Sequence, residues 1–90
     1  MIFKISYLIY LIYIQKYAKK LKTEGRVEEA QFVLRLNVAL YPYDPYVYQQ
    51  LGVFYLKQNK IELAKENLFL SLKLNPDNPY VIDQLSNLNN

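Results

Sequence analysis

A chain of 90 residues has room for one small domain, and this one contains neither cysteine nor histidine. It therefore lacks disulfides, thiol chemistry and the side chain most often used as a general base or metal ligand. The net charge of +3, from 11 basic and 8 acidic residues, is too small to suggest a nucleic-acid partner, and we expect no cofactor and no metal ion.

The first half of the chain has the pattern of two helices. Residues 2–22 form a long apolar-periodic segment without Pro or Gly, and residues 26–40 place apolar side chains three and four positions apart. Gly25 lies between them and suits the left-handed conformation that often ends a helix. The pattern predicts a helical hairpin.

Three more helices are expected in the second half. Asp44 can cap the next helix with its carboxylate, and Pro45 fits its first turn. That helix should run to about Lys57, followed by helices over residues 61–74 and from Pro79 onward. Because no stretch alternates as a strand does, the fold class expected is all-α.

The chain also repeats itself at a fixed interval along the sequence. This interval equals the separation of Ala30 from Ala64, and we call it the repeat interval. The other matched pairs include Leu34 with Leu68, Leu40 with Leu74, Pro42 with Pro76, Asp44-Pro45-Tyr46-Val47 with Asn78-Pro79-Tyr80-Val81, and Gln50-Leu51 with Gln84-Leu85. A fixed period of this length indicates a solenoid of identical helical units, and such proteins usually bind partners rather than catalyse.

These positions resemble the tetratricopeptide repeat, a helix–turn–helix unit of about 34 residues. Residues 45–78 carry the family's signature at Tyr48, Leu51, Gly52, Tyr55, Ala64, Leu68 and Pro76, and residues 11–44 keep Ala18, Leu21, Gly25, Ala30, Leu34 and Pro42. The resemblance implies two tetratricopeptide repeats in a right-handed α-solenoid. Residues 1–10 would extend the first helix, and residues 79–90 would form a partial third repeat or capping helix.

Residues 26–78 also resemble the repeat tail at the C-terminus of bacterial serine hydrolases, both β-lactamase-like enzymes and esterases. That resemblance brings no catalysis with it, because none of the three serines lies in S-x-x-K or G-x-S-x-G and there is no histidine. We therefore expect a chain that is not an enzyme. The alternatives are a free protein–protein interaction module or the accessory tail of a hydrolase.

In the tetratricopeptide family the concave surface is formed by the first helix of each repeat. Mapped onto this chain, the partner-binding residues implied are Lys16, Lys19, Tyr46, Gln49, Gln50, Val53, Tyr80 and Gln84. An extended peptide or partner protein with an acidic end and an apolar middle would suit them. The other reading is that these are ordinary surface residues and that the convex side, with Phe32, Leu36, Phe69 and Leu70, is the interaction surface.

Residues 2–14 are almost wholly apolar, and lysines 16, 19, 20 and 22 follow them. A helix of this length spans roughly 20 Å, short of a bilayer core of about 30 Å. Three readings stay open: a packing helix that self-associates through residues 2–14, a helix at a membrane surface in a membrane-associated assembly factor, and a signal-peptide core. The expected location is cytoplasmic, with membrane association as the alternative.

Overall fold

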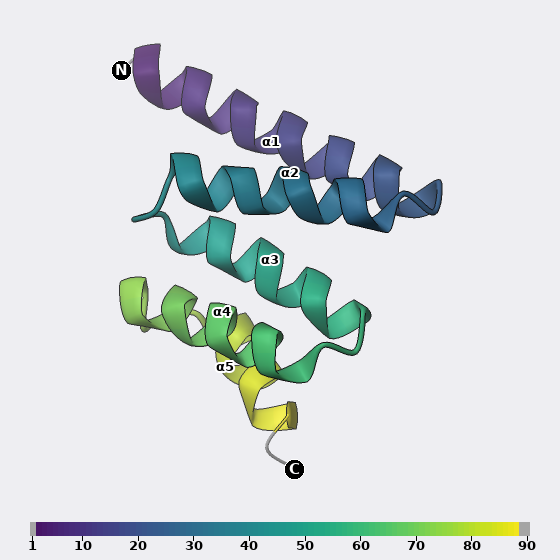
Figure 1. Ribbon diagram of the computed structural model, residues 1–90. Helices are drawn as coiled ribbons and strands as arrows, with labels where there is room; N and C mark the ends of the chain where they lie inside the picture. Colours follow the sequence, from purple (N-terminus) through teal and green to yellow (C-terminus); the bar gives the residue numbers. More distant parts are fainter. Residues whose placement is uncertain (1, 89–90) are drawn as a thin grey trace. The chain divides into compact units, whose positions relative to one another are not determined.

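The computed structural model describes the backbone of residues 2–88 and the side chains of residues 12–88. Over that range the regular structure consists of helices α1 (Ile2–Thr23), α2 (Val27–Leu40), α3 (Pro45–Lys57), α4 (Ile61–Leu74) and α5 (Pro79–Leu88), as Figure 1 shows. Strands are absent from the same residues. The all-α prediction is therefore confirmed, and the first four helices begin and end within a residue of where they were expected.

The chain divides into two compact units, Met1–Asn37 and Val38–Asn90. In the first unit, α1 and the greater part of α2 each bury one side. The buried side chains are spaced three or four residues apart, as an amphipathic helix requires. They are Ala18 and Leu21 on α1, and Ala30, Leu34 and Asn37 on α2.

In the second unit, α3 packs along α4, and α4 also packs against α5. Its buried cluster consists of Leu68, Val81 and Leu85, with partly buried Val53 and Leu56 packed against it. A glycine lies where α3 contacts α4. A Cβ built on Gly52 would lie 2.8 Å from both Cγ and Cδ2 of Leu68. The absence of a side chain is what lets α3 lie this close to α4.

The turn between α1 and α2 and the turn between α3 and α4 have the same backbone hydrogen bonds. In the first turn the backbone N–H of Arg26 donates to the oxygen of Leu21, and that of Gly25 to the oxygen of Lys22. In the second turn, one repeat interval later, the N–H of Lys60 donates to Tyr55 and that of Asn59 to Leu56. In each turn the pair is the six-to-one and five-to-two bonding of a Schellman helix end. The residue at its centre has a left-handed backbone, with φ of 77° at Gly25 and 59° at Asn59.

The helices α3 and α5 also begin in the same way. The Asp44 carboxylate accepts a hydrogen bond from the backbone N–H of Tyr46 at 2.8 Å. In α5 the Asn78 side-chain oxygen accepts from the N–H groups of Tyr80 at 3.1 Å and Val81 at 3.3 Å. The predicted cap at Asp44 is therefore confirmed, and Asn78 caps the later helix at the equivalent position of the repeat.

Within the described part of the chain, no helix is both long enough and apolar enough to cross a membrane. The readings for residues 2–14 concern mainly side chains 2–11, and these lie outside the described residues. For residues 12–14, Ile12 and Tyr13 are exposed and Ile14 is half-buried.

Candidate partner-binding surface

The second unit holds six of the eight predicted partner-binding residues. Four lie on α3 at positions that share one side of a helix, and two lie one turn apart on α5. These six are Tyr46, Gln49, Gln50, Val53, Tyr80 and Gln84. The structure thus gathers them on two helices of the same compact unit.

Two of the six have structural roles that the sequence did not reveal. The Gln49 side-chain oxygen accepts a hydrogen bond from the Asn78 amide at 2.8 Å, which joins α3 to the start of α5. Val53 packs against the buried cluster that contains Leu68, Val81 and Leu85. Both side chains hold the helices in place, which leaves the other four as the predicted residues without such a packing or inter-helix role.

Those four residues form two pairs, each of one tyrosine and one glutamine. Tyr46 and Gln50 lie one turn apart on α3, and Tyr80 and Gln84 have the same spacing on α5, one repeat interval later. Tyr80 is 45% exposed, and the other three are half-buried. A tyrosine ring offers rigid contact area, and a glutamine amide both donates and accepts hydrogen bonds. Two such pairs, placed beside an extended peptide, can hydrogen-bond to the backbone amides of that peptide.

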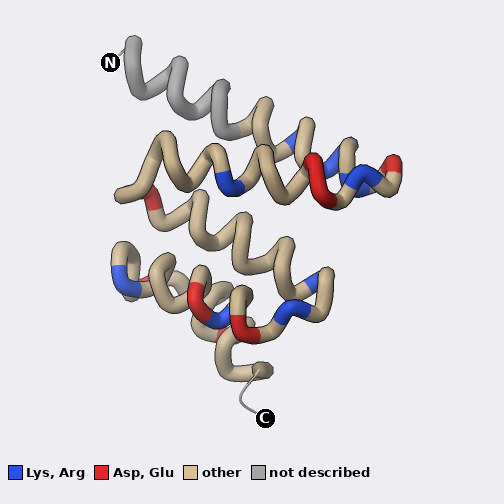
Figure 2. The backbone as a smooth tube through the Cα atoms, viewed as in Figure 1, with Lys and Arg blue, Asp and Glu red and all other residues tan. Residues whose placement is uncertain are grey.

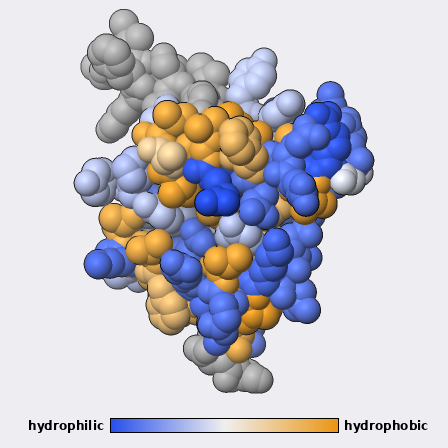
Figure 3. All heavy atoms as spheres, in the orientation of Figure 1, coloured by the Kyte–Doolittle hydropathy of each residue, from blue (hydrophilic) through white to orange (hydrophobic). Residues whose placement is uncertain are grey.

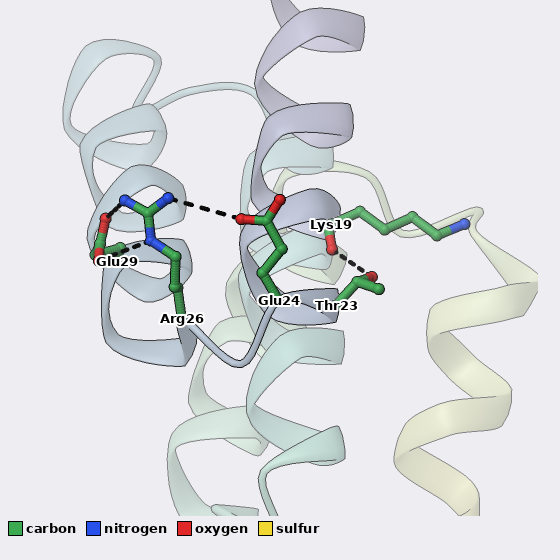
Figure 4. Close-up of polar contacts among 5 residues, drawn as sticks. All are labelled: Lys19, Thr23, Glu24, Arg26 and Glu29. Carbon is green, nitrogen blue, oxygen red and sulfur yellow. Dashed lines mark hydrogen bonds and ion pairs between the residues drawn. The ribbon is translucent and has the colours of Figure 1, made fainter.

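The remaining two predicted residues, Lys16 and Lys19, lie on α1 in the first unit. Both are exposed. Thr23 donates its hydroxyl hydrogen to the backbone oxygen of Lys19 at 2.8 Å, and the Lys19 side chain itself extends away from the turn (Figure 4).

Charge at that turn is concentrated around Arg26, which binds two carboxylates. Its Nε donates to Glu29 Oε1 at 2.9 Å, a second guanidinium nitrogen contacts Glu29 Oε2, and Nη1 lies 3.7 Å from Glu24 Oε2 (Figure 4). The hydrogen bond from Arg26 lowers the pKa of Glu29, and the same bond raises the pKa of Arg26. Both changes favour the charged forms that the two side chains already have at neutral pH.

Three polar contacts in the second unit were not predicted. Ser71 is fully buried and donates its hydroxyl hydrogen to the backbone oxygen of Pro45 at 2.9 Å, which ties α4 to the start of α3. Tyr48 donates to the backbone oxygen of Pro42 at 2.7 Å, and Asn67 donates to that of Leu63 at 2.9 Å. In a sequence, any serine, tyrosine or asparagine side chain has many possible hydrogen-bond acceptors. Which acceptor it uses depends on the fold.

The alternative interaction surface is exposed in both units. Phe32 and Leu36 are exposed on α2, and Phe69 and Leu70 on α4. On the face seen in Figure 3, hydrophobic side chains gather over α2. Exposed apolar side chains on a small domain often mark contacts with other molecules. Both this surface and the predicted surface on α3 and α5 are therefore at least partly accessible to solvent.

Comparison with known proteins adds no relative. No family model matches the chain, and no curated protein and no solved structure gives a match. Among the described residues, no group of three or more acidic side chains is placed to hold a metal ion.

Proposed function

We propose that this chain is a non-catalytic protein–protein interaction module built of two tetratricopeptide-like helix pairs, α1–α2 and α3–α4, with α5 as a capping helix. The observation that supports this most strongly is the hydrogen bonding of the two turns, which recurs at the repeat interval. That interval equals the length of the tetratricopeptide unit. Because helix ends of this kind are common, the support comes from their separation by the repeat interval, together with the matching sequence around them.

Burial recurs at the same interval, which supports the proposal independently of the turns. The buried pairs at equivalent positions are Ala18 and Gly52, Leu21 and Tyr55, Ala30 and Ala64, Leu34 and Leu68, and Asn37 and Ser71. Each pair matches in burial, although the two side chains often differ in type. Matched burial at these five positions is what identical supersecondary units require. At three other positions the units differ, because Tyr13, Tyr17 and Lys20 are exposed where Val47, Leu51 and Phe54 are buried.

The partner proposed for the second unit is an extended peptide segment. The two Tyr–Gln pairs, Tyr46 with Gln50 and Tyr80 with Gln84, present the same chemistry on α3 and α5. Backbone amides of a bound segment would hydrogen-bond to the glutamines, and its side chains would lie against the tyrosine rings. This recognition does not depend on a charged group in the partner.

A peptide library displayed on phage tests this proposal. Peptides selected on the full chain should bind it and lose about tenfold or more in affinity for the Tyr46→Ala, Tyr80→Ala double variant, because aromatic anchors contribute strongly to such interfaces. The melting temperature of the variant should change little, since Tyr80 is exposed and Tyr46 is only half-buried.

The matched control is the Phe32→Ala, Phe69→Ala double variant. It also removes two aromatic rings, but from exposed positions on α2 and α4. Selected peptides should bind it as they bind the unchanged chain. Loss of binding in this control, with full binding retained by the tyrosine variant, would move the interaction surface to α2 and α4.

A further inference from the structure

The second half of α1 carries a surface that the proposed peptide site does not use. Ile12, Tyr13 and Tyr17 are 52%, 73% and 49% exposed. Together with Lys16 and Lys20 they line one shallow hollow on the side of the helix. Spacings of three and four positions relate them and place them on one side of α1, which we call the tyrosine–lysine face.

Most of this face is turned away from the buried side of α1. Ile12, Tyr13, Lys16 and Lys20 are exposed, whereas the first unit buries Ala18 and Leu21. Tyr17 lies at the edge of the face, where it also lines a second hollow with Leu21 and residues of α2. Large apolar side chains exposed on one side of a helix, among basic residues, are typical of a helix that lies at a membrane surface.

Charge is distributed unevenly along the chain. Residues 1–23 contain five lysines and no acidic residue, whereas residues 24–90 contain six basic and eight acidic residues. In the described part of α1, Figure 2 shows the basic residues in its second half. These are Lys16, Lys19, Lys20 and Lys22. Helix α1 is therefore strongly positive, although the net charge of the whole chain is small.

Two carboxylates near the end of α1 are held by an arginine. Glu24 and Glu29 are both bound by Arg26, and the Lys19 side chain extends away from them (Figure 4). Among the described residues, Lys16, Lys19 and Lys20 form no ion pair. Their charges are available to an external anionic surface.

We propose that the tyrosine–lysine face of α1 binds the surface of a bilayer that contains anionic lipids. The helix would lie in the plane of the interface, with its lysines at lipid phosphates and carboxylates. Ile12, Tyr13 and Tyr17 would enter the boundary between headgroups and acyl chains, where tyrosine is favoured because its ring is apolar and its hydroxyl is wet. Charge complementarity selects the anionic lipid, and the exposed apolar side chains distinguish a bilayer from a soluble polyanion.

This inference is independent of the peptide site, which lies in the other unit, and it is tested with the full chain and lipid vesicles. The chain should co-float with phosphatidylcholine vesicles containing about 30% phosphatidylserine, and much less with phosphatidylcholine alone. Raising the salt from about 0.1 M to about 1 M should release most of it, because the Debye length falls from about 10 Å to about 3 Å. Equal binding to both vesicles, or to neither, would overturn the proposal.

Two triple variants with the same change in charge locate the binding surface. Lys16→Gln, Lys19→Gln and Lys20→Gln together should weaken partitioning into anionic vesicles by about 100-fold, since each lysine near such a surface contributes about a factor of five. The control combines Lys57→Gln, Lys65→Gln and Lys73→Gln, which lie on α3 and α4. It should bind nearly as the unchanged chain does.

Equal weakening in both triple variants would mean that net charge, not α1, drives binding, and would overturn the assignment. So would unchanged binding in the α1 variant. A third variant, Tyr13→Ser with Tyr17→Ser, keeps every charge and should weaken partitioning by about tenfold through lost burial of two rings. If the α1 variants instead abolish binding to an anionic polymer such as heparin and leave vesicle binding intact, the face recognises a soluble polyanion.

Discussion

The two helix pairs have turns with the same backbone hydrogen bonds, but the side chains around the two turns differ. At the first turn Arg26 binds Glu24 and Glu29. The equivalent residues of the second turn are Lys60, Gln58 and Leu63, which can form no such network. There the Lys60 ammonium lies 6.0 Å from the centre of the Tyr55 ring instead. The backbone bonds and the left-handed residue define the turn, and the surrounding side chains are free to vary.

A second difference concerns how closely the helices approach. The small residue of the first pair is Ala18, and that of the second is Gly52. Both are buried, but only at Gly52 does a neighbouring side chain, Leu68, occupy the space that a Cβ would need. The same repeat position is therefore under a stricter size limit in the second unit.

A large loss of stability is expected when the alanine that both pairs bury is enlarged. Ala30 and Ala64 are each 0% exposed, so enlarging either one forces the surrounding helices to move. Ala64→Leu and Ala30→Leu should each lower the free energy of unfolding by about 1–3 kcal/mol through overpacking. Urea denaturation of the full chain measures both. If either substitution leaves the midpoint unchanged, that alanine does not occupy the close contact the repeat requires.

The next effect tests the stricter size limit at Gly52. Gly52→Ala should destabilise the chain by about 1–2 kcal/mol, because overpacking against Leu68 outweighs the gain of about 1 kcal/mol in helix propensity. Ala18→Gly, the reverse change at the equivalent position, should cost about 0.5–1 kcal/mol from propensity alone. A stabilised Gly52→Ala chain would show that Leu68 moves aside easily.

Adding Leu68→Ala to Gly52→Ala shows where the clash arises. The leucine change alone should cost about 2–5 kcal/mol by opening a cavity. In its presence the new Cβ at position 52 should no longer destabilise, so the two changes should be non-additive. Additive costs would mean that the effect of Gly52→Ala comes from elsewhere in α3.

Much of this architecture could be predicted from local chemistry. Asp44 before Pro45 fixed the start of α3, and Gly25 marked the first turn, because these signals act within a few residues. The roles of the residues predicted to bind a partner were harder to assign. Gln49 and Val53 have the helical spacing of the predicted surface, yet one bonds to Asn78 and the other packs on the buried cluster. Those contacts join positions far apart in the sequence and depend on how the helices pack, which spacing alone does not encode.

A smaller effect separates backbone conformation from packing at the first turn. No atom lies within 4 Å of a Cβ built on Gly25, so Gly25→Ala meets no steric obstacle beyond its own backbone. The left-handed φ should still cost about 1 kcal/mol. At the second turn, Asn59→Gly should change stability by no more than about 0.5 kcal/mol, since both residues tolerate this conformation. Thermal melts compare the two, and a Gly25→Ala chain as stable as the original would mean that the turn has changed conformation.

The smallest effect concerns the ion pair found only at the first turn. Arg26→Gln should raise the pKa of Glu29 toward its ordinary value, because the hydrogen bond from Arg26 is the main cause of its lowered pKa. A carboxylate whose pKa is lowered by folding contributes stability above its unfolded pKa of about 4.3, and this is lost as the pH falls through the lower folded value. The melting temperatures of the original and Arg26→Gln chains should therefore differ slightly at neutral pH and converge in acid. Lys60→Gln at the second turn, where Leu63 replaces the carboxylate, should show no such convergence. A carboxyl titration by NMR that leaves the pKa of Glu29 unmoved by Arg26→Gln would show that the pair does not form in solution.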